Sequence, residues 1–154
     1  MDPSVRRFIR ASLVWLGVGV LIGVAMAFVP ARALAYRPAH MHANLLGFVS
    51  MMIFGVAYHV IPRFTGHPLH APRLVAVHLW VANAGLVAMA GGFIVRVHAF
   101  GIGTGMVEAG GTASAVGAYL FIYNLWRTLG DGSPVPVPLG RARPMAHPAP
   151  GGTR

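Results

Sequence analysis

Residues 40–66, HMHANLLGFVSMMIFGVAYHVIPRFTG, decide the fold of this chain. Between Met41 and Ile61 the stretch contains no Asp, Glu, Lys or Arg. An apolar run of roughly 20 residues is the length that crosses a bilayer as a helix. The stretch therefore predicts a membrane-spanning helix that begins at a His-x-His pair, His40 and His42.

Three similar apolar runs accompany this one, at residues 8–29, 74–95 and 105–126. Only 10% of the residues are charged, against about 25% in soluble domains. The sequence predicts an all-α, polytopic membrane protein, built as an antiparallel four-helix transmembrane bundle. Prolines separate the runs, so we expect helix ends there and connections of roughly 8 to 12 residues. These prolines are Pro30, Pro38, Pro62, Pro68 and Pro72.

The net charge of +9 comes from arginines that flank the apolar runs, a distribution that sets membrane orientation rather than nucleic-acid binding. With the N-terminus inside, nine arginines lie on the inner side and three, Arg32, Arg37 and Arg96, on the outer side. We therefore expect a multi-pass protein of the inner (plasma) membrane, with both termini cytoplasmic. The first run is too long for a typical cleavable signal and is interpreted as a retained span.

The composition changes at Asp131, after which Gly, Pro and Ala dominate. Such a segment cannot bury a core and is predicted to be disordered. We expect a transmembrane domain at residues 1–130 and a cytoplasmic tail at 131–154. Within the first run, Gly19-x-x-x-Gly23-x-x-x-Ala27 forms a small-residue ridge that allows close helix packing, most simply within the chain.

Eight histidines are many for a membrane protein of this size, and histidine is the usual protein ligand of heme iron. On a helix, His40 and His42 project about 200° apart, so they cannot chelate one metal together. They could serve two hemes, or one heme and one structural contact. The spacing alone favours two interfacial histidines satisfied by water.

The other histidines differ in position. His98 closes the third run at the same end as His40 and His42, and is either a second axial ligand or an interfacial residue. His78 is expected to pack against a neighbour through a hydrogen bond. Glu108 could pair with Arg96 or an imidazole, although a surface position is more usual. With no Cys and no carboxylate pair, the sequence offers no thiolate site and no acid–base dyad.

Residues 40–66 resemble the tenth helix of the catalytic subunit of heme-copper oxidases and nitric oxide reductases. The matching residues are His40, His42, Gly55, His59, Pro62, Phe64 and Gly66, and the Tyr-x-x-x-Pro-Arg ending at 58–63 is closest to the cbb type. Residues 77–80, followed by Gly85, resemble the eleventh helix, and residues 123–128 the end of the twelfth. The first run corresponds to the ninth helix by order alone.

The resemblance implies heme b, with His40 matching the high-spin ligand and His42 the low-spin ligand. His78 matches a family histidine that does not bind heme. The helices that carry the other low-spin ligand and the copper or non-heme iron ligands have no counterpart here. The chain is therefore expected not to be a complete oxidase or nitric oxide reductase by itself.

Two functions follow as expectations. The first is a heme b membrane protein for electron transfer or binding of O2 or NO, whose second axial ligand comes from His98 or from a symmetry mate in a homo-oligomer, a dimer as first guess. The second is a non-heme accessory subunit of a respiratory or denitrification complex. A metal or solute transporter is disfavoured, because intramembrane acids are lacking. The membrane lipid is an expected partner, and the redox partner is unknown.

Overall fold

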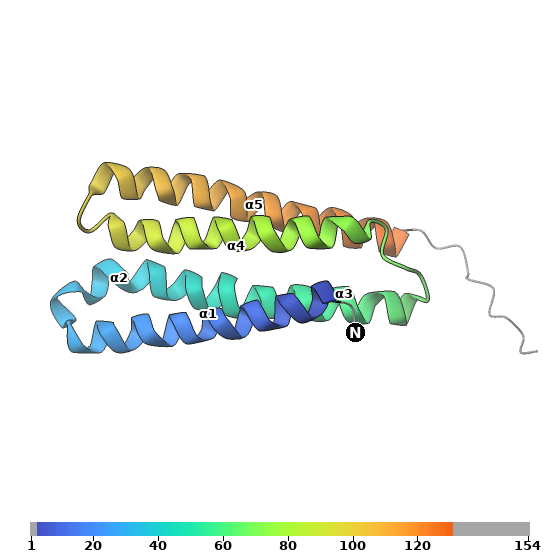
Figure 1. Ribbon diagram of the computed structural model, residues 1–154, viewed down its shortest axis with the longest axis horizontal. Coiled ribbons are helices and arrows are strands. Elements are labelled where there is room, and N and C mark those ends of the chain that lie inside the picture. Colours follow the sequence, from blue (N-terminus) through green and yellow to red (C-terminus); the bar gives the residue numbers. More distant parts are fainter. Residues whose placement is uncertain (1–2, 131–154) are drawn as a thin grey trace, which may run out of the picture.

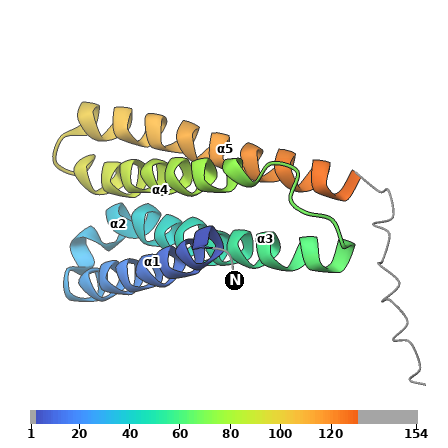
Figure 2. The same ribbon diagram turned by 45° about the vertical axis from the view of Figure 1, so that its right-hand side comes forward.

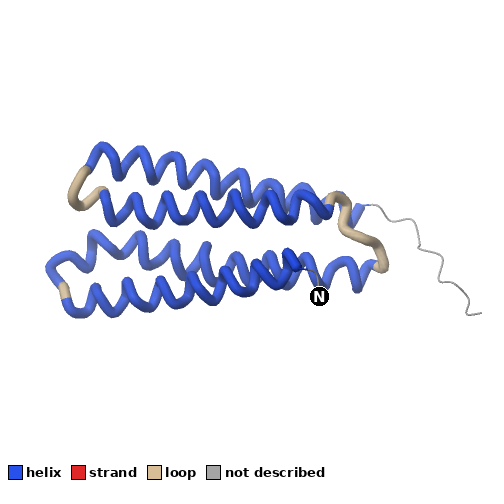
Figure 3. Tube along the Cα trace, viewed as in Figure 1, coloured by secondary structure: helices blue, strands red, loops and turns tan. Residues whose placement is uncertain are grey.

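The computed structural model describes residues 3–130, and within that range every regular element is a helix (Figure 3). The elements are α1 Pro3–Phe28, α2 Pro30–His42, the π-helix η1 Ala43–Ser50, α3 Met51–Thr65, α4 Pro72–Val95 and α5 Phe100–Gly130. The predicted tail at 131–154, including His147, lies outside the described residues.

Three helices are long and apolar enough to cross a membrane: Pro3–Phe28, the continuous helix Pro30–Thr65, and Pro72–Val95. The fourth expected span, residues 105–126, is helical within α5. Its glycines and Glu108 lower its mean hydropathy, and it is not among the three spans found in the described residues. Residues 3–130 are thus all-helical apart from their short connections, with helices of the membrane-spanning type.

The helices lie lengthwise: α1, the continuous helix from α2 through η1 to α3, then α4 and α5 each run back along the one before (Figure 1). Helix α1 packs against α2, η1 and α3, while α4 packs along α5. Helix α1 and the helix from α2 to α3 form one pair, and α4 and α5 form the other. The two pairs meet where α4 contacts α1 and α2, and a second view shows the same arrangement (Figure 2). The start of α1, the end of α3, the start of α4 and the end of α5 share one end, which we call the arginine-rich end. Its described arginines are Arg6, Arg7, Arg10, Arg63, Arg73 and Arg127.

The predicted connections are too long. Val29 alone separates α1 from α2, and residues 66–71 and 96–99 form the other two connections. Alanine, leucine and arginine after Pro30 are strong helix formers, so the helix begins well before the apolar run.

Pro38 and Pro62, expected at helix ends, lie inside α2 and α3. Proline is tolerated inside membrane helices, where neighbouring groups satisfy the freed backbone. Gly66 ends α3 in the left-handed region, with φ +72°.

Two clusters of buried side chains hold the helices together. The cluster nearer the arginine-rich end contains Val5, Phe8, Met51, Tyr58, Val75, Leu79, Ala82 and Leu125, and the other contains Trp15, Ala43, Leu86, Met89 and Ala90. Close approach of α4 and α5 depends on glycine. A Cβ atom at Gly85 would lie 2.7 Å from the amide nitrogen of Ser114, so only hydrogen fits there.

Candidate functional site

His40 and His42 lie in the last turn of α2, immediately before η1. Their side chains contact different neighbours, as their spacing predicts. The imidazole of His40 contacts α1, whereas that of His42 contacts Phe93 of α4. No single metal ion can therefore be shared by the pair.

His40 is held tightly between α2 and α1. Its Nδ1 atom lies 2.8 Å from the carbonyl oxygen of Gly19, and a carbonyl only accepts, so Nδ1 carries the proton. The side chain of Asn44 packs directly over Gly19, and a Cβ atom at Gly23 would come within 2.9 Å of His40 Cε1. The small-residue ridge of α1 thus receives His40 and Asn44, which confirms that it serves packing within the chain.

His42 presents a different arrangement. Its Nδ1 donates to the carbonyl oxygen of Pro38, 2.7 Å away and one turn earlier. The ring lies 5.1 Å from the ring of Phe93, with an interplanar angle of 32°. In the neutral imidazole the other nitrogen, Nε2, then holds a free lone pair. This is the tautomer and the fixed orientation that a metal-binding imidazole requires.

The half-buried ring of His42 borders an apolar pocket of about 220 Å³ on the outer face of the helix. Met41, Leu45 and Leu46 form the rest of its lining. A polar side chain beside an apolar, open face is costly in a membrane and usually functional there. The arrangement supplies one free nitrogen donor surrounded by hydrocarbon.

A π-helix follows the histidines directly and was not predicted. Ala43 and Gly47 of η1 are buried, and a Cβ atom at Gly47 would lie 2.6 Å from Trp15 Cβ. Trp15 is anchored in turn, because its Nε1 donates to Asn83 Oδ1 at 2.9 Å. Short π-helical segments occur frequently at functional sites. The pairing of a buried glycine with a tryptophan of another helix carries no local sequence signal.

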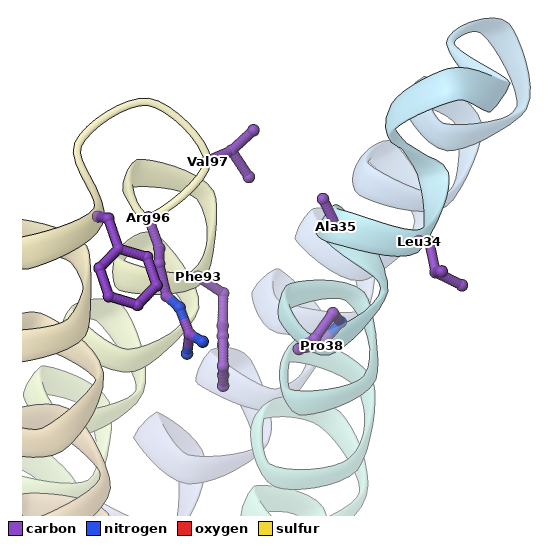
Figure 4. A pocket seen from close by; sticks show the side chains of 7 residues that line it. Leu34, Ala35, Pro38, Phe93, Arg96 and Val97 are labelled. Carbon is purple, nitrogen blue, oxygen red and sulfur yellow. The ribbon is translucent and has the colours of Figure 1, made fainter.

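A second pocket, of about 310 Å³, lies between α2 and the end of α4. Figure 4 shows Phe93 of α4 and Arg96, just after the end of α4, extending into this space opposite Pro38 and Ala35. The guanidinium of Arg96 lies 5.1 Å from the ring centroid of Phe100. Phe93 links the two pockets, because it lines this one and also contacts His42. Glu108 is exposed on α5, in agreement with its interpretation as a surface residue.

His98 is exposed in the connection after α4. Its Nε2 lies 3.5 Å from the hydroxyl of Tyr36, a residue that the sequence did not single out. Among residues 3–130, no group of three or more His, Cys, Asp or Glu side chains is placed to hold a metal ion. The described part of the chain therefore offers individual imidazole donors rather than a multidentate metal centre.

His78 is completely buried, as its packed interpretation predicts. Its Nδ1 lies 3.1 Å from the Tyr58 hydroxyl, and the rings of Phe8 and Phe54 lie 4.9 Å and 4.6 Å away. Its Nε2 atom is buried and has no hydrogen-bond partner among the described residues. His59, by contrast, contacts Arg63 at the exposed end of α3. Both lie near the arginine-rich end, away from His42.

No protein-family model matches the chain. It is 29% identical to the cbb3-type cytochrome c oxidase subunit CcoN1 of Stutzerimonas stutzeri, over 86% of this chain and 34% of that protein. It is 26% identical to cytochrome c oxidase subunit 1 of Rhodobacter capsulatus, over 83% of this chain and 29% of the relative. A bacteroid homolog of the same subunit from Bradyrhizobium diazoefficiens is 26% identical over 83% of this chain and 28% of its own length. The chain spans about a third of the length of these relatives, and its resemblance to part of heme-copper oxidase subunit I is confirmed over most of its length.

Proposed function

We propose that this chain is a heme b-binding, multi-pass membrane protein that acts in electron transfer or in binding a diatomic gas. The observation that carries the proposal is the geometry of His42. Its Nδ1 is fixed by the Pro38 carbonyl at 2.7 Å, and its ring borders an apolar pocket. Similarity to cytochrome c oxidase subunit 1 supports heme as the group that this donor takes.

The histidine donor and the apolar lining beside it fit a heme group. His42 Nε2 would bind the iron, and Met41, Leu45 and Leu46 would contact the porphyrin. Phe93 would hold the imidazole from the α4 side, and Arg96, in the adjoining pocket, is a cation suited to a propionate. When bound, the heme would supply one-electron redox chemistry or an iron site for O2 or NO.

His40 has a weaker claim on an iron. Its ring is wedged against Gly23 and its Nδ1 contacts Gly19, so it already serves the contact between α1 and α2. We propose that His40 acts mainly in this contact and that His42 is the principal ligand. A second heme on His40 is the alternative that the family resemblance raises.

We propose that the iron bound by His42 takes its second protein ligand from a second copy of the chain. His98 is the candidate within one chain, yet its described contact is with Tyr36. The pocket beside His42 lies on an outer face, where a partner could approach it. A homodimer would then place two such faces against each other.

The proposed topology is a four-helix transmembrane bundle in the inner membrane, with both termini cytoplasmic. Packing of α5 along α4 supports α5 as the fourth span. Because the chain contains no cysteine, single cysteines can report the topology directly. A cysteine at Ser4 or Gly130 should react only with a membrane-permeant thiol reagent in intact cells, and one at Arg32 with an impermeant reagent as well.

A visible spectrum of the detergent-solubilised protein tests the function. Expression with ample heme should give a Soret band, and sharp α and β bands on reduction would indicate six-coordinate, low-spin iron. A protein that purifies folded but without a Soret band would contradict heme binding. It would favour a non-heme accessory subunit of a respiratory or denitrification complex, a role compatible with a chain that spans a third of its relatives.

A further inference from the structure

A cavity of about 480 Å³ lies between α1 and α4, away from His42. Arg7 and Ala11 of α1 line one side, and Leu79, Trp80 and Asn83 of α4 line the other. Trp80 is 70% exposed and Arg7 is exposed, so the cavity opens on the outer surface of the helices. In a membrane protein this surface faces lipid.

The amide of Asn83 is already occupied. Its Oδ1 accepts the Trp15 indole N–H at 2.9 Å, and its Nδ2 donates to the Leu79 carbonyl at 2.7 Å. Asn83 Nδ2 also lies 3.8 Å from the sulfur of Met51, so the amide is committed to contacts within the chain. The guanidinium of Arg7 remains as the polar group of the cavity.

Arg7 favours an anion. The one acidic side chain among residues 3–130 is Glu108 of α5, in the half of that helix away from the arginine-rich end. No described carboxylate thus neutralises this region, and Arg6 and Arg10 add further positive charge nearby in sequence. Basic residues at the end of membrane helices attract anionic headgroups.

The rest of the lining favours a hydrocarbon chain. Ala11 and Leu79 are apolar, and Trp80 offers a broad indole face. Tryptophan and arginine occur together where the hydrocarbon of a bilayer meets its headgroups. We propose that this cavity binds one anionic phospholipid, with its phosphate at Arg7 and an acyl chain along Ala11, Leu79 and Trp80. The proposal rests on membrane insertion of the chain and is independent of heme binding.

Fluorescence quenching by brominated lipids tests the site. The chain has three tryptophans, of which Trp80 and Trp126 are exposed and Trp15 is buried. In the Trp126→Phe background, quenching by dibrominated phosphatidylglycerol and by dibrominated phosphatidylcholine is compared in vesicles containing the full chain. One arginine beside an anionic headgroup should favour phosphatidylglycerol by about fivefold.

Variants of the arginines separate this site from general lipid contact. Arg7→Gln should abolish the preference, so that the ratio of phosphatidylglycerol to phosphatidylcholine binding falls to about 1. Arg7→Lys should retain the preference, because the phosphate is attracted by the positive charge. Arg6→Gln is the matched control, since Arg6 is exposed on the same turn of α1 but does not line the cavity, and it should behave as the wild type.

Several outcomes would overturn the proposal. These are equal quenching by both lipids in the wild type, a preference that survives Arg7→Gln, or displacement of the bromolipid by a quinone or by inorganic phosphate. A measurement on the wild type alone is also decisive. Because exposed charges are screened, high salt should weaken the phosphatidylglycerol preference, and a salt-independent preference would exclude Arg7 as its cause.

Discussion

The Nδ1 atom of His42 and the carbonyl oxygen of Pro38 lie 2.7 Å apart, so the backbone of α2 fixes the ring of its own histidine. Together with the ring contact of Phe93, this hydrogen bond orients Nε2. His40 Nδ1 also contacts a backbone carbonyl, but its ring is packed against Gly23 of α1, whereas the ring of His42 borders an apolar pocket. Removal of His42 is therefore the most direct test of function.

His42→Ala should lower the heme content per protein at least about tenfold, since even outer-shell partners of metal ligands are worth that much in affinity. The measurement is the pyridine hemochrome assay on protein purified after expression with ample heme. His147→Ala, in the predicted tail, should keep the wild-type content. Equal heme in both variants would remove His42 from the ligands.

Gly19→Ala should destabilise the protein by about 1–3 kcal/mol, because the added methyl group overlaps the side chain of Asn44. Gly17→Ala is the matched control in the same helix, since its Cβ meets nothing within 4 Å. Alanine is the better helix former, so this control should be neutral or slightly more stable. Unfolding in mixed detergent micelles, followed by helical circular dichroism, measures both. An equal loss of stability in the two variants would contradict the packing of α1 against Asn44 of η1.

Tyr58→Phe should cost about 1–3 kcal/mol, because it leaves the buried Nδ1 of His78 without its partner. The heme content should not change, since His78 packs among aromatic rings near the arginine-rich end. The same unfolding and hemochrome measurements apply. A stable variant that has lost heme would reverse the assignment of His78 as a packing residue.

Light scattering combined with the reduced spectrum tests the source of the second axial ligand. We expect a homodimer with low-spin iron, and His98→Ala should leave both unchanged. A monomer that is fully six-coordinate, and that becomes high-spin in His98→Ala, would instead assign the ligand to His98 within the chain.

The positions of the long helices could be predicted from the sequence, because apolar runs near the length of a bilayer have few other stable conformations in a membrane. The residues at which these helices begin and end could not be predicted. Residues 30–40 are helical because alanine, leucine and arginine propagate a helix through Pro38, whereas the proline alone suggested a break. The opposed directions of His40 and His42 followed from helical geometry.

The surroundings of the site depended on tertiary contacts and were beyond sequence reasoning. Nothing local indicates that Phe93 contacts the ring of His42, that Tyr36 contacts His98, or that Gly19 faces Asn44. Each of these pairs joins residues that are far apart in the sequence. Small residues were recognised as packing positions, but their partners are set by the relative rotation of the helices.

The π-helix Ala43–Ser50 joins α2 to α3 in one continuous helix. A π-helical turn holds more residues than an α-helical turn, so the segment sets the rotational phase between its two ends. If the same eight residues formed an α-helix, each would turn the chain by about 100°, and α3 would face another direction relative to His42. Either His42 or the buried Tyr58 would then have to leave its present neighbours. The π-helical segment thus sets the angle between the two helices that it joins. It links the direction of His42 to the packing of Tyr58 in the core.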